Sequence, residues 1–255
     1  MHAVTLPQLF RLDGKRALVT GAGRGLGARM ATALAEAGAQ VTLIARTADE
    51  INQVRDGIVH HGGAAETATF DITDAAAVTK FFATQRAFNV LVNNAGTNRP
   101  APLVDTPDGD IDAVFNLNVM AAFRMAREVA RGLIAAQQPG SIINVSSQMG
   151  HVGSPNRTVY CASKHALEGM TKALAWELGP HNIRVNSLCP TFIETPLTAP
   201  MLAKPEFRAW VVGNIALNRV GREAEVAGPV VFLASDASSL MTGSALMIDG
   251  GWTAR

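Results

Sequence analysis

The fold of this chain is determined by the stretch Thr20-Gly21-Ala22-Gly23-Arg24-Gly25-Leu26-Gly27. The apolar run Lys15–Thr20 before it predicts a buried strand, and the alanine-rich segment Ala28–Ala37 after it predicts a helix that Gly38 can end in the left-handed conformation. A glycine-rich turn between a strand and a helix lets the backbone approach a pyrophosphate, and the helix N-terminus favours the negative charge. The position of the turn therefore predicts dinucleotide binding, although glycines there also suit a plain tight turn.

Helices and strands are predicted to alternate along the rest of the chain. The segments with these patterns are Val41–Ala45, Val78–Thr84, Val90–Asn93, Ile111–Ala136, Ser141–Ser146, Val159–Leu178 and Ile183–Leu188. Four prolines in residues 190–205 predict an irregular connection before a helix over Phe207–Asn214. We therefore expect an α/β fold over residues 1–255: a single Rossmann-type domain with a doubly wound, mostly parallel sheet, helices on both faces and a substrate loop at about 190–215.

The composition excludes several classes of protein. A hydrophobic fraction of 48% with 5% aromatic residues suits strands covered by helices, and a net charge of +1 gives no electrostatic reason to expect nucleic acid or a membrane as partner. The apolar stretches are shorter than the roughly 20 residues that cross a bilayer, and the N-terminus does not resemble a signal peptide, so we expect a cytoplasmic protein with a small-molecule substrate. Cys161 and Cys189 have no metal-type spacing, which predicts structural thiols, no disulfide framework and no metal site.

Six stretches, in order along the chain, resemble the short-chain dehydrogenase/reductase family. They are the Thr-Gly-x-x-x-Gly-x-Gly turn from Thr20, Asn93-Asn94-Ala95-Gly96, Asn118, Ser147 with Tyr160 and Lys164, Arg184-Val185-Asn186 and Ile248-Asp249-Gly250-Gly251. The resemblance covers the chain from about Leu12 to Trp252. It implies an NAD(P)-dependent enzyme that moves a hydride between a nicotinamide and a secondary alcohol or ketone, with Asn118, Ser147, Tyr160 and Lys164 as catalytic residues.

The pair Tyr160 and Lys164 has a chemical use at its spacing. Residues four apart on a helix project from the same face. Because a free tyrosine has a pKa of about 10, proton transfer near neutrality requires a stabilised phenolate, and a lysine ammonium can supply that charge. The resemblance implies that Lys164 also holds the nicotinamide ribose, that Ser147 positions the substrate oxygen and that Asn118 anchors a water of the proton relay. Ser146 is the competing serine, although it could instead satisfy the strand end. Asn116 is the neighbouring alternative to Asn118, and Asn118 could instead cap or bend its helix.

The residues after the second strand predict the nicotinamide cofactor. A carboxylate there would accept hydrogen bonds from a free ribose 2′-hydroxyl and repel a 2′-phosphate. This chain has Ala45-Arg46 instead, and Asp49 and Glu50 have the pattern of first-turn helix residues. Arg46, helped by Arg24, could grip a phosphate, so NADP is the preferred cofactor; NAD remains the alternative if both arginines lie in solvent.

The resemblance implies further cofactor contacts. Asp71 and Ile72 would lie near the adenine, although Asp71 could instead help to start the helix after Thr73. The remaining positions are Gly21, Gly25, Leu26, Gly27, Asn94, Ala95, Gly96, Tyr160, Lys164, Pro190, Ile193 and Thr195. Thr191 replaces the glycine that is usual after this proline, which leaves the local backbone path open.

Substrate contacts are expected from the segments that flank the catalytic residues: Gln148–Thr158, Asn98, Arg99 and the loop with Trp210. The polar candidates Gln148, His151, Asn156 and Arg157 favour a sugar, a polyol or a small oxoacid, whereas Met149, Phe192 and Trp210 could form an apolar pocket. His151 alone better suits a structural or surface role.

Three other functions and an assembly follow from the resemblance. A 3-oxoacyl thioester reductase belongs to the same family, and a catalytically idle NADP-binding regulator need not retain the four catalytic residues. An epimerase or dehydratase of the extended branch needs a longer chain and a different glycine spacing. The long helices Ile111–Ala136 and Val159–Leu178 would suit the four-helix interface of a homotetramer, or they could be ordinary core.

Overall fold

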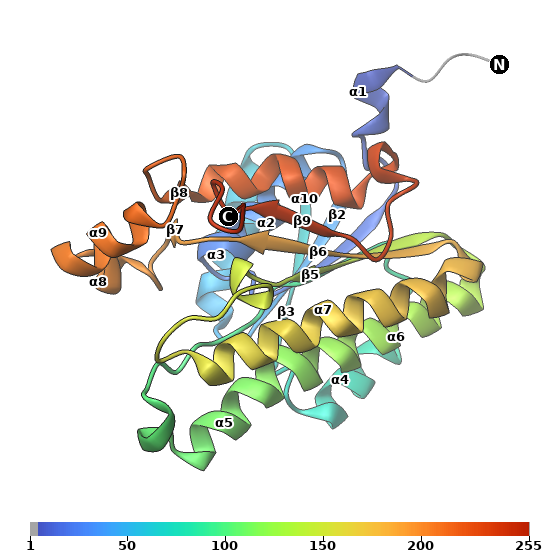
Figure 1. The fold of residues 1–255 in the computed structure, drawn as a ribbon. Helices are drawn as coiled ribbons and strands as arrows, with labels where there is room; N and C mark the ends of the chain where they lie inside the picture. The colour runs from blue at the N-terminus through green and yellow to red at the C-terminus, as the bar shows by residue number, and fades with distance from the viewer. Residues whose placement is uncertain (1–4, 255) are drawn as a thin grey trace.

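The computed structural model describes residues 5–254, and seven parallel strands form its central sheet (Figure 1). The strand order is β3-β2-β1-β4-β5-β6-β9, with the bounds β1 (Arg16–Thr20), β2 (Gln40–Ala45), β3 (Ala64–Thr69), β4 (Val90–Asn93), β5 (Gly140–Val145), β6 (Ile183–Pro190) and β9 (Ala245–Ile248). Most of these segments are continuous buried apolar runs, as a sheet covered on both faces requires. The expected doubly wound Rossmann-type fold is confirmed. Its strand order reverses between β1 and β4, where ligands bind in such sheets.

Helices cover both faces of the sheet (Figure 1). One layer holds α2 (Gly25–Glu36), α3 (Ala48–His60) and α10 (Ala227–Ala234), and the other holds α4 (Ala75–Phe82), α5 (Asp108–Phe115), α6 (Ala122–Ala136) and α7 (Thr158–Leu178). A short helix, α1 (Leu6–Leu9), precedes β1. Two apolar cores result, one on each face of the sheet. Leu34 and Val230 belong to the first, and Met125 and Leu178 to the second.

The long helix predicted over Ile111–Ala136 is wrong as a single α-helix. A π-helical segment, Asn116–Ala121, separates α5 from α6. The side chain of Asn118 explains the wider turn, because it is drawn to the backbone of Thr97 and to the hydroxyl of Ser163 rather than to solvent. Such π-helical turns occur frequently at functional sites.

The connection over residues 190–205 is more regular than its prolines predict. Strand β7 (Ile193–Glu194) pairs with β8 (Gly221–Arg222), and the one-turn helix α8 (Ala199–Leu202) precedes α9 (Pro205–Gly213). The Thr198 hydroxyl stabilises this path because it donates to the carbonyl of Ile193 at 2.5 Å. Figure 1 shows α8 and α9 projecting beyond one end of the sheet. We call these two helices the cap. Among residues 5–254, no helix combines the length and apolarity needed to cross a membrane.

Candidate active site

Four strand ends meet at one edge of the sheet. The glycine-rich turn follows β1, residues 94–96 follow β4, Ser146 and Ser147 follow β5, and Pro190 ends β6. Because these strands are parallel and adjacent, their carboxyl ends bring together four of the segments in which the sequence predicts catalytic or cofactor residues.

The glycine-rich turn packs too tightly for side chains. Gly21 has a φ of +63°, and a Cβ placed there would lie 2.9 Å from Ala95 Cα. A Cβ on Gly27 would overlap the Gly21 carbonyl and the Asn94 amide. Asn94 holds this arrangement, since its Nδ2 donates to the carbonyls of Thr20 at 2.9 Å and Gly21 at 3.1 Å. The glycines are therefore required by close packing of the backbone.

The N-terminus of α2 is open toward an anion. Arg24 occupies the N-cap position in extended conformation, and its side chain makes no capping hydrogen bond to the helix. Gly25, with a φ of +57°, starts the helix, followed by Leu26 and Gly27. Free first-turn amides on a glycine-walled turn fit the pyrophosphate of a dinucleotide. Across from them lies Thr195, whose Cβ would be 3.7 Å from a Cβ placed on Gly25.

The two arginines predicted to contact the ribose phosphate are exposed and only weakly paired. Arg46 directly follows β2 with 77% of its side chain exposed, and its Nη1 is 3.9 Å from Asp71. Arg24 is 69% exposed and 3.4 Å from Glu50, which lies in the first turn of α3, as expected. Exposed ion pairs of this kind contribute little, about 0–1 kcal/mol, so either guanidinium can turn toward a phosphate.

Asp71 does not start the following helix. Its Oδ1 accepts hydrogen bonds from the backbone and hydroxyl of Thr73 at 2.9 and 2.8 Å, which orders the turn that carries the buried Ile72. Burial opposes ionisation of Asp71, but these bonds and the charge of Arg46 hold its pKa below the usual value. Asp74 is the actual N-cap of α4, because it accepts from the amides of Ala76 and Ala77. The alternative helix-starting role of Asp71 is thus wrong.

Tyr160 and Lys164 lie in the first two turns of α7 and face the end of β5. Lys164 is 4% exposed, its Nζ donates to the Val145 carbonyl at 2.8 Å, and it lies 5.6 Å from the centroid of the Tyr160 ring. Burial raises the pKa of Tyr160, and a hydrogen bond with the Ser147 side chain opposes this rise. Ser146 points elsewhere and its hydroxyl has no hydrogen-bond partner in the described part of the chain. The geometry therefore favours Ser147 over Ser146 beside the tyrosine.

Burial opposes the charged form of both members of this pair. It raises the pKa of Tyr160 above its ordinary value, and the opposing groups are Ser147 and then Arg157. Burial also lowers the pKa of Lys164 to about 8. The ammonium donates to the Val145 carbonyl and lies 5.6 Å from the centroid of the Tyr160 ring. The expectation that Lys164 makes the phenol more acidic stays a prediction.

Asn118 joins the loop after β4 to α7. Its Oδ1 accepts from the Thr97 amide at 2.8 Å, and its Nδ2 donates to the Thr97 carbonyl and the Ser163 hydroxyl, each at 3.0 Å. A Cβ on Gly96 would lie 3.2 Å from Asn118 Oδ1 and 3.7 Å from Lys164 Nζ. Asn118 and Lys164 thus both lie close to Gly96, and both amide hydrogens of Asn118 are already used.

The segment after β6 holds three residues that are predicted to contact the cofactor. Pro190 ends β6, Ile193 is buried in β7, and Thr195 bonds Thr198 at 3.1 Å. The hydroxyl of Thr191 is buried without a hydrogen-bond partner in residues 5–254. The threonine that departs from the family pattern therefore adds an unpaired polar group to this segment.

The apolar candidates for substrate contact pack mainly against one another. Phe192 is 8% exposed and its ring centroid lies 5.8 Å from Trp252 and 5.6 Å from Phe207. Met149 belongs to the same cluster, whereas Trp210 is 40% exposed at its rim. These side chains form the core that attaches the cap to the sheet, and they leave little apolar surface for a substrate.

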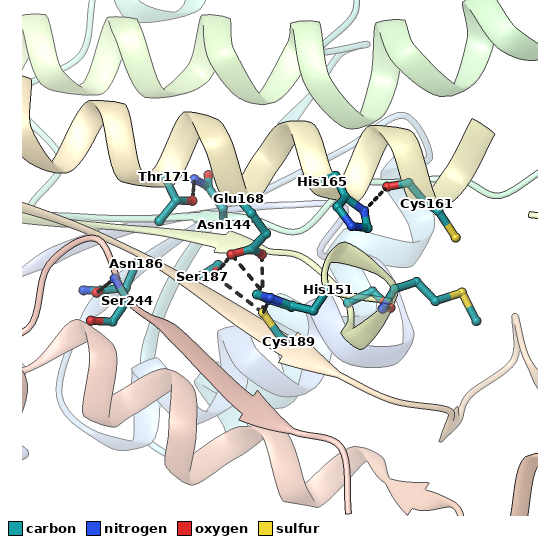
Figure 2. Close-up of polar contacts among 12 residues, drawn as sticks. Asn144, His151, Cys161, His165, Glu168, Thr171, Asn186, Ser187, Cys189 and Ser244 are labelled. Carbon is teal, nitrogen blue, oxygen red and sulfur yellow. Dashed lines mark hydrogen bonds and ion pairs between the residues drawn. The ribbon is translucent and has the colours of Figure 1, made fainter. Parts of the chain in front are cut away.

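One juxtaposition has no signal in the sequence. His151 lies in the turn after β5, Glu168 in α7 and Cys189 in β6, and their side chains converge (Figure 2). Burial, followed by the charge of Glu168, raises the pKa of the Cys189 thiol to about 12. Each residue lies in a segment that is unremarkable on its own, so only the packing of α7 across β6 reveals the cluster.

The fold and the strand-end site define a Rossmann-type protein built for a dinucleotide and a small organic substrate. A family model described as enoyl-(acyl carrier protein) reductase matches residues 21–253. L-Xylulose reductase of Bos taurus is 39% identical over 245 residues, which are 96% of this chain and 99% of that protein. Gluconate 5-dehydrogenase of Gluconobacter oxydans is 38% identical over 251 residues, covering 97% of this chain and 98% of that protein.

Solved structures agree with these relatives. The crystal structure of a gluconate 5-dehydrogenase from Burkholderia cenocepacia in complex with NADP and tartrate is 35% identical, with a TM-score of 0.93, and the match covers 98% of this chain and 100% of that chain. This chain therefore belongs to the short-chain dehydrogenase/reductase family. It is an NAD(P)-dependent oxidoreductase that interconverts alcohols and ketones, acting on CH–OH groups.

Proposed function

We propose that this enzyme uses NADP to interconvert a hydroxyl and a ketone on a polyhydroxy carboxylate, with Tyr160 as general acid and base. The observation that carries the substrate class is Arg157, one turn before Tyr160. It is 7% exposed, and no carboxylate within residues 5–254 pairs with it.

The surroundings of Arg157 are apolar. Its guanidinium lies 5.6 Å from the Phe192 ring and 5.8 Å from the Phe207 ring, and its hydrogen-bonding contact is with Met201 Sδ at 3.9 Å. Burial lowers the pKa of Arg157. An arginine stays charged in proteins, so a buried one without a counter-ion is a costly arrangement that a substrate carboxylate would relieve with bidentate hydrogen bonds.

Unpaired polar atoms support a hydroxylated substrate. Gln148 Nε2, Asn98 Oδ1 and Thr191 Oγ1 are buried without hydrogen-bond partners among the described residues. Gln148 follows Ser147, Asn98 lies in the loop after β4, and Thr191 follows the end of β6. Buried polar groups are costly when unpaired. Hydroxyl groups of a sugar acid would satisfy them, whereas the alkyl chain of an acyl thioester would not.

The relatives are consistent with this substrate class. Two of them are named for a ketose and for gluconate, and a crystal structure of a third holds tartrate, a dihydroxy dicarboxylate. A substrate with both hydroxyls and a carboxylate combines the two features that the site of this chain presents.

Four residues of the site would have separate roles in the proposed hydride and proton transfer. Bound NADP would supply the hydride acceptor or donor and, when oxidised, a positive ring beside the phenol. Ser147 would hold the substrate oxygen near Tyr160, which removes the hydroxyl proton in oxidation and returns it in reduction. Lys164 would hold the nicotinamide ribose, and Asn118 would order the path behind the lysine through Thr97.

The preference for NADP over NAD rests on charge at the end of β2. Arg46 and Arg24 are exposed and only weakly paired, and no carboxylate follows β2 directly. A 2′-phosphate would find two guanidinium groups there, and the Asn94–Gly96 segment with Asp71 and Ile72 would border the adenosine.

The exposed apolar side chains of α6 and α7 support a homotetramer. Phe123 and Ile134 are 45% and 39% exposed, Met120 in the π-helical segment is 48% exposed, and Trp176 is 88% exposed. Pairing of α5, α6 and α7 with a second copy would cover these residues. The cytoplasmic location and the absence of nucleic-acid partners stay predictions.

Steady-state kinetics with matched substrates test the proposal. We expect kcat/KM with NADP⁺ to be higher for gluconate than for xylitol, which lacks a carboxylate. Arg157→Met should lower kcat/KM for gluconate about 10–100-fold, because the hydrogen bonds to the substrate carboxylate are lost. The same variant should leave kcat/KM for xylitol nearly unchanged. Arg55→Met, on the exposed surface of α3, is the control. An equal loss for both substrates, or a higher rate with an acetoacetyl thioester, would overturn the assignment.

A further inference from the structure

The convergence of His151, Glu168 and Cys189 has the chemistry of a metal centre. The three side chains supply an imidazole nitrogen, a carboxylate and a sulfur, the ligand types that bind zinc in proteins. They come from three different segments (Figure 2), and two of them are buried. Cys189 is fully buried and the Glu168 side chain is 7% exposed, whereas the His151 side chain is 30% exposed.

The distances match a tetrahedral site. Cys189 Sγ lies 3.6 Å from His151 Nε2 and 3.4 Å from Glu168 Oε1, and His151 Nε2 lies 3.6 Å from Glu168 Oε2. Ligand atoms bonded to one zinc ion at about 2.0–2.3 Å in a tetrahedron are separated by about 3.3–3.7 Å. Cys189 Sγ and His151 Nε2 lie at such a distance from each other, and each lies at such a distance from a different Glu168 oxygen, Oε1 and Oε2 respectively. A small rotation of the carboxylate would bring one of its oxygens into a three-ligand set, and the exposed side of His151 leaves room for the fourth ligand.

Neighbouring hydroxyls orient the ligands. Ser187 donates to Glu168 Oε2 at 2.8 Å and lies 3.5 Å from Cys189 Sγ. Burial raises the pKa of the Cys189 thiol, and the nearby Ser146 hydroxyl only partly opposes this rise. Ser146 is 3% exposed, and its hydroxyl has no aligned hydrogen-bond partner within residues 5–254. A buried hydroxyl with free hydrogen-bonding capacity beside the sulfur fits a thiolate or a metal-bound water as its acceptor.

We propose that His151, Glu168 and Cys189 bind one zinc ion, or a similar divalent transition metal, with solvent as the fourth ligand. The sulfur binds as a thiolate and its proton passes to solvent, with no change in oxidation state. The ion ties the turn after Ser147 to α7 and β6, one helical turn beyond Lys164. This site differs from the sequence expectation of no metal, because only one of the two cysteines takes part and its partners lie far away in the chain.

Cobalt spectroscopy tests the site without any activity measurement. The purified full-length enzyme is stripped with a chelator and titrated with Co²⁺ and then Zn²⁺, in the wild type and in Cys189→Ser, His151→Ala and the control Cys161→Ser. Cys161 is also buried and free but lies outside the cluster. We expect about one ion per chain and a thiolate-to-cobalt absorption band in the wild type and in Cys161→Ser.

The variants separate a metal site from a hydrogen-bonded network. Cys189→Ser should lose the thiolate band, His151→Ala should weaken binding strongly, and Ser187→Ala should weaken it about 10–100-fold through loss of carboxylate orientation. His151→Ala keeps the test valid if Cys189→Ser does not fold, since the His151 side chain is partly exposed. The proposal is overturned if the wild type shows no thiolate band, or if the band survives Cys189→Ser or disappears in Cys161→Ser.

Discussion

At the scale of single residues, burial dominates the chemistry of the proposed catalytic pair. It raises the pKa of Tyr160 and lowers that of Lys164 to about 8, so both side chains are shifted toward their neutral forms. Positive charges nearby oppose the rise in the pKa of the phenol, and they include Arg157 and the ring of a bound oxidised nicotinamide. The tyrosine is thus expected to be a more efficient base in the complex with the oxidised cofactor.

Replacement of Tyr160 by phenylalanine tests its role in proton transfer. We expect Tyr160→Phe to lower kcat by at least about 100-fold while NADPH still binds, because the hydroxyl is lost and the ring keeps its packing. Stopped turnover with intact NADPH fluorescence would separate an enzyme from a cofactor-binding regulator. If Tyr160→Phe retains full activity, the proposed general acid and base is wrong.

Replacement of Arg46 tests the cofactor preference. Arg46→Ala should lower kcat/KM for NADP about 10–100-fold, the effect of losing charge-assisted hydrogen bonds to a phosphate, and should change the value for NAD little. Arg55→Ala on α3 serves as the matched control. A preference for NAD in the wild type that persists in Arg46→Ala would contradict the assignment.

At the scale of elements, two local departures from regular structure position the site. The turn between β1 and α2 requires glycine because a Cβ on Gly27 would overlap the Gly21 carbonyl and the Asn94 amide. The π-helical segment between α5 and α6 places Asn118 against Thr97 and Ser163. The glycine turn and the π-helical segment each hold segments of the proposed site together. Changes in either one should therefore affect both cofactor binding and the stability of the protein.

Two glycine-to-alanine substitutions separate packing from helix propensity. Gly27→Ala should destabilise the protein by about 1–3 kcal/mol through overpacking and should weaken NADPH binding. Gly57→Ala, in α3 with no neighbouring atom within 4 Å of a new Cβ, should stabilise it by about 0.5–1 kcal/mol. Denaturant unfolding and NADPH titration measure both effects. Normal NADPH affinity in Gly27→Ala would refute the role given to the turn.

At the scale of the whole molecule, the sheet edge and the cap form the site together. The cap is attached by its own apolar core, in which Phe192, Val211 and Trp252 are buried. This arrangement places Arg157 between the cap and α7. Phe123 in α6 and Trp176 in α7 expose apolar surface that an assembly would cover.

Light scattering tests the proposed assembly. We expect the mass of four chains of 26.8 kDa for the wild type and a smaller species for Phe123→Glu, since a charge at a buried apolar contact is costly. Val59→Glu, on exposed α3, should leave the mass unchanged. A wild-type monomer would rule out the homotetramer.

Local patterns were sufficient to predict much of this fold. The strands β1, β4, β5 and β6 and the helix α7 have short-range signals, namely apolar runs and helical spacing, and their predicted bounds agree with the structure to within about two residues. The prediction failed at Asn116–Ala121 and Ile193–Leu202, where side-chain hydrogen bonds to distant or looped backbone override local preference.

The amino-acid sequence by itself determined the Rossmann-type layering, the glycine-rich turn and the family, because these depend on periodicity and on residues close together in the chain. Only the tertiary structure decided that Arg157 has no counter-ion, that Lys164 turns toward Val145 and that His151, Glu168 and Cys189 meet. Burial and long-range contact control charge and coordination, and they exist only after strands and helices far apart in sequence have packed together.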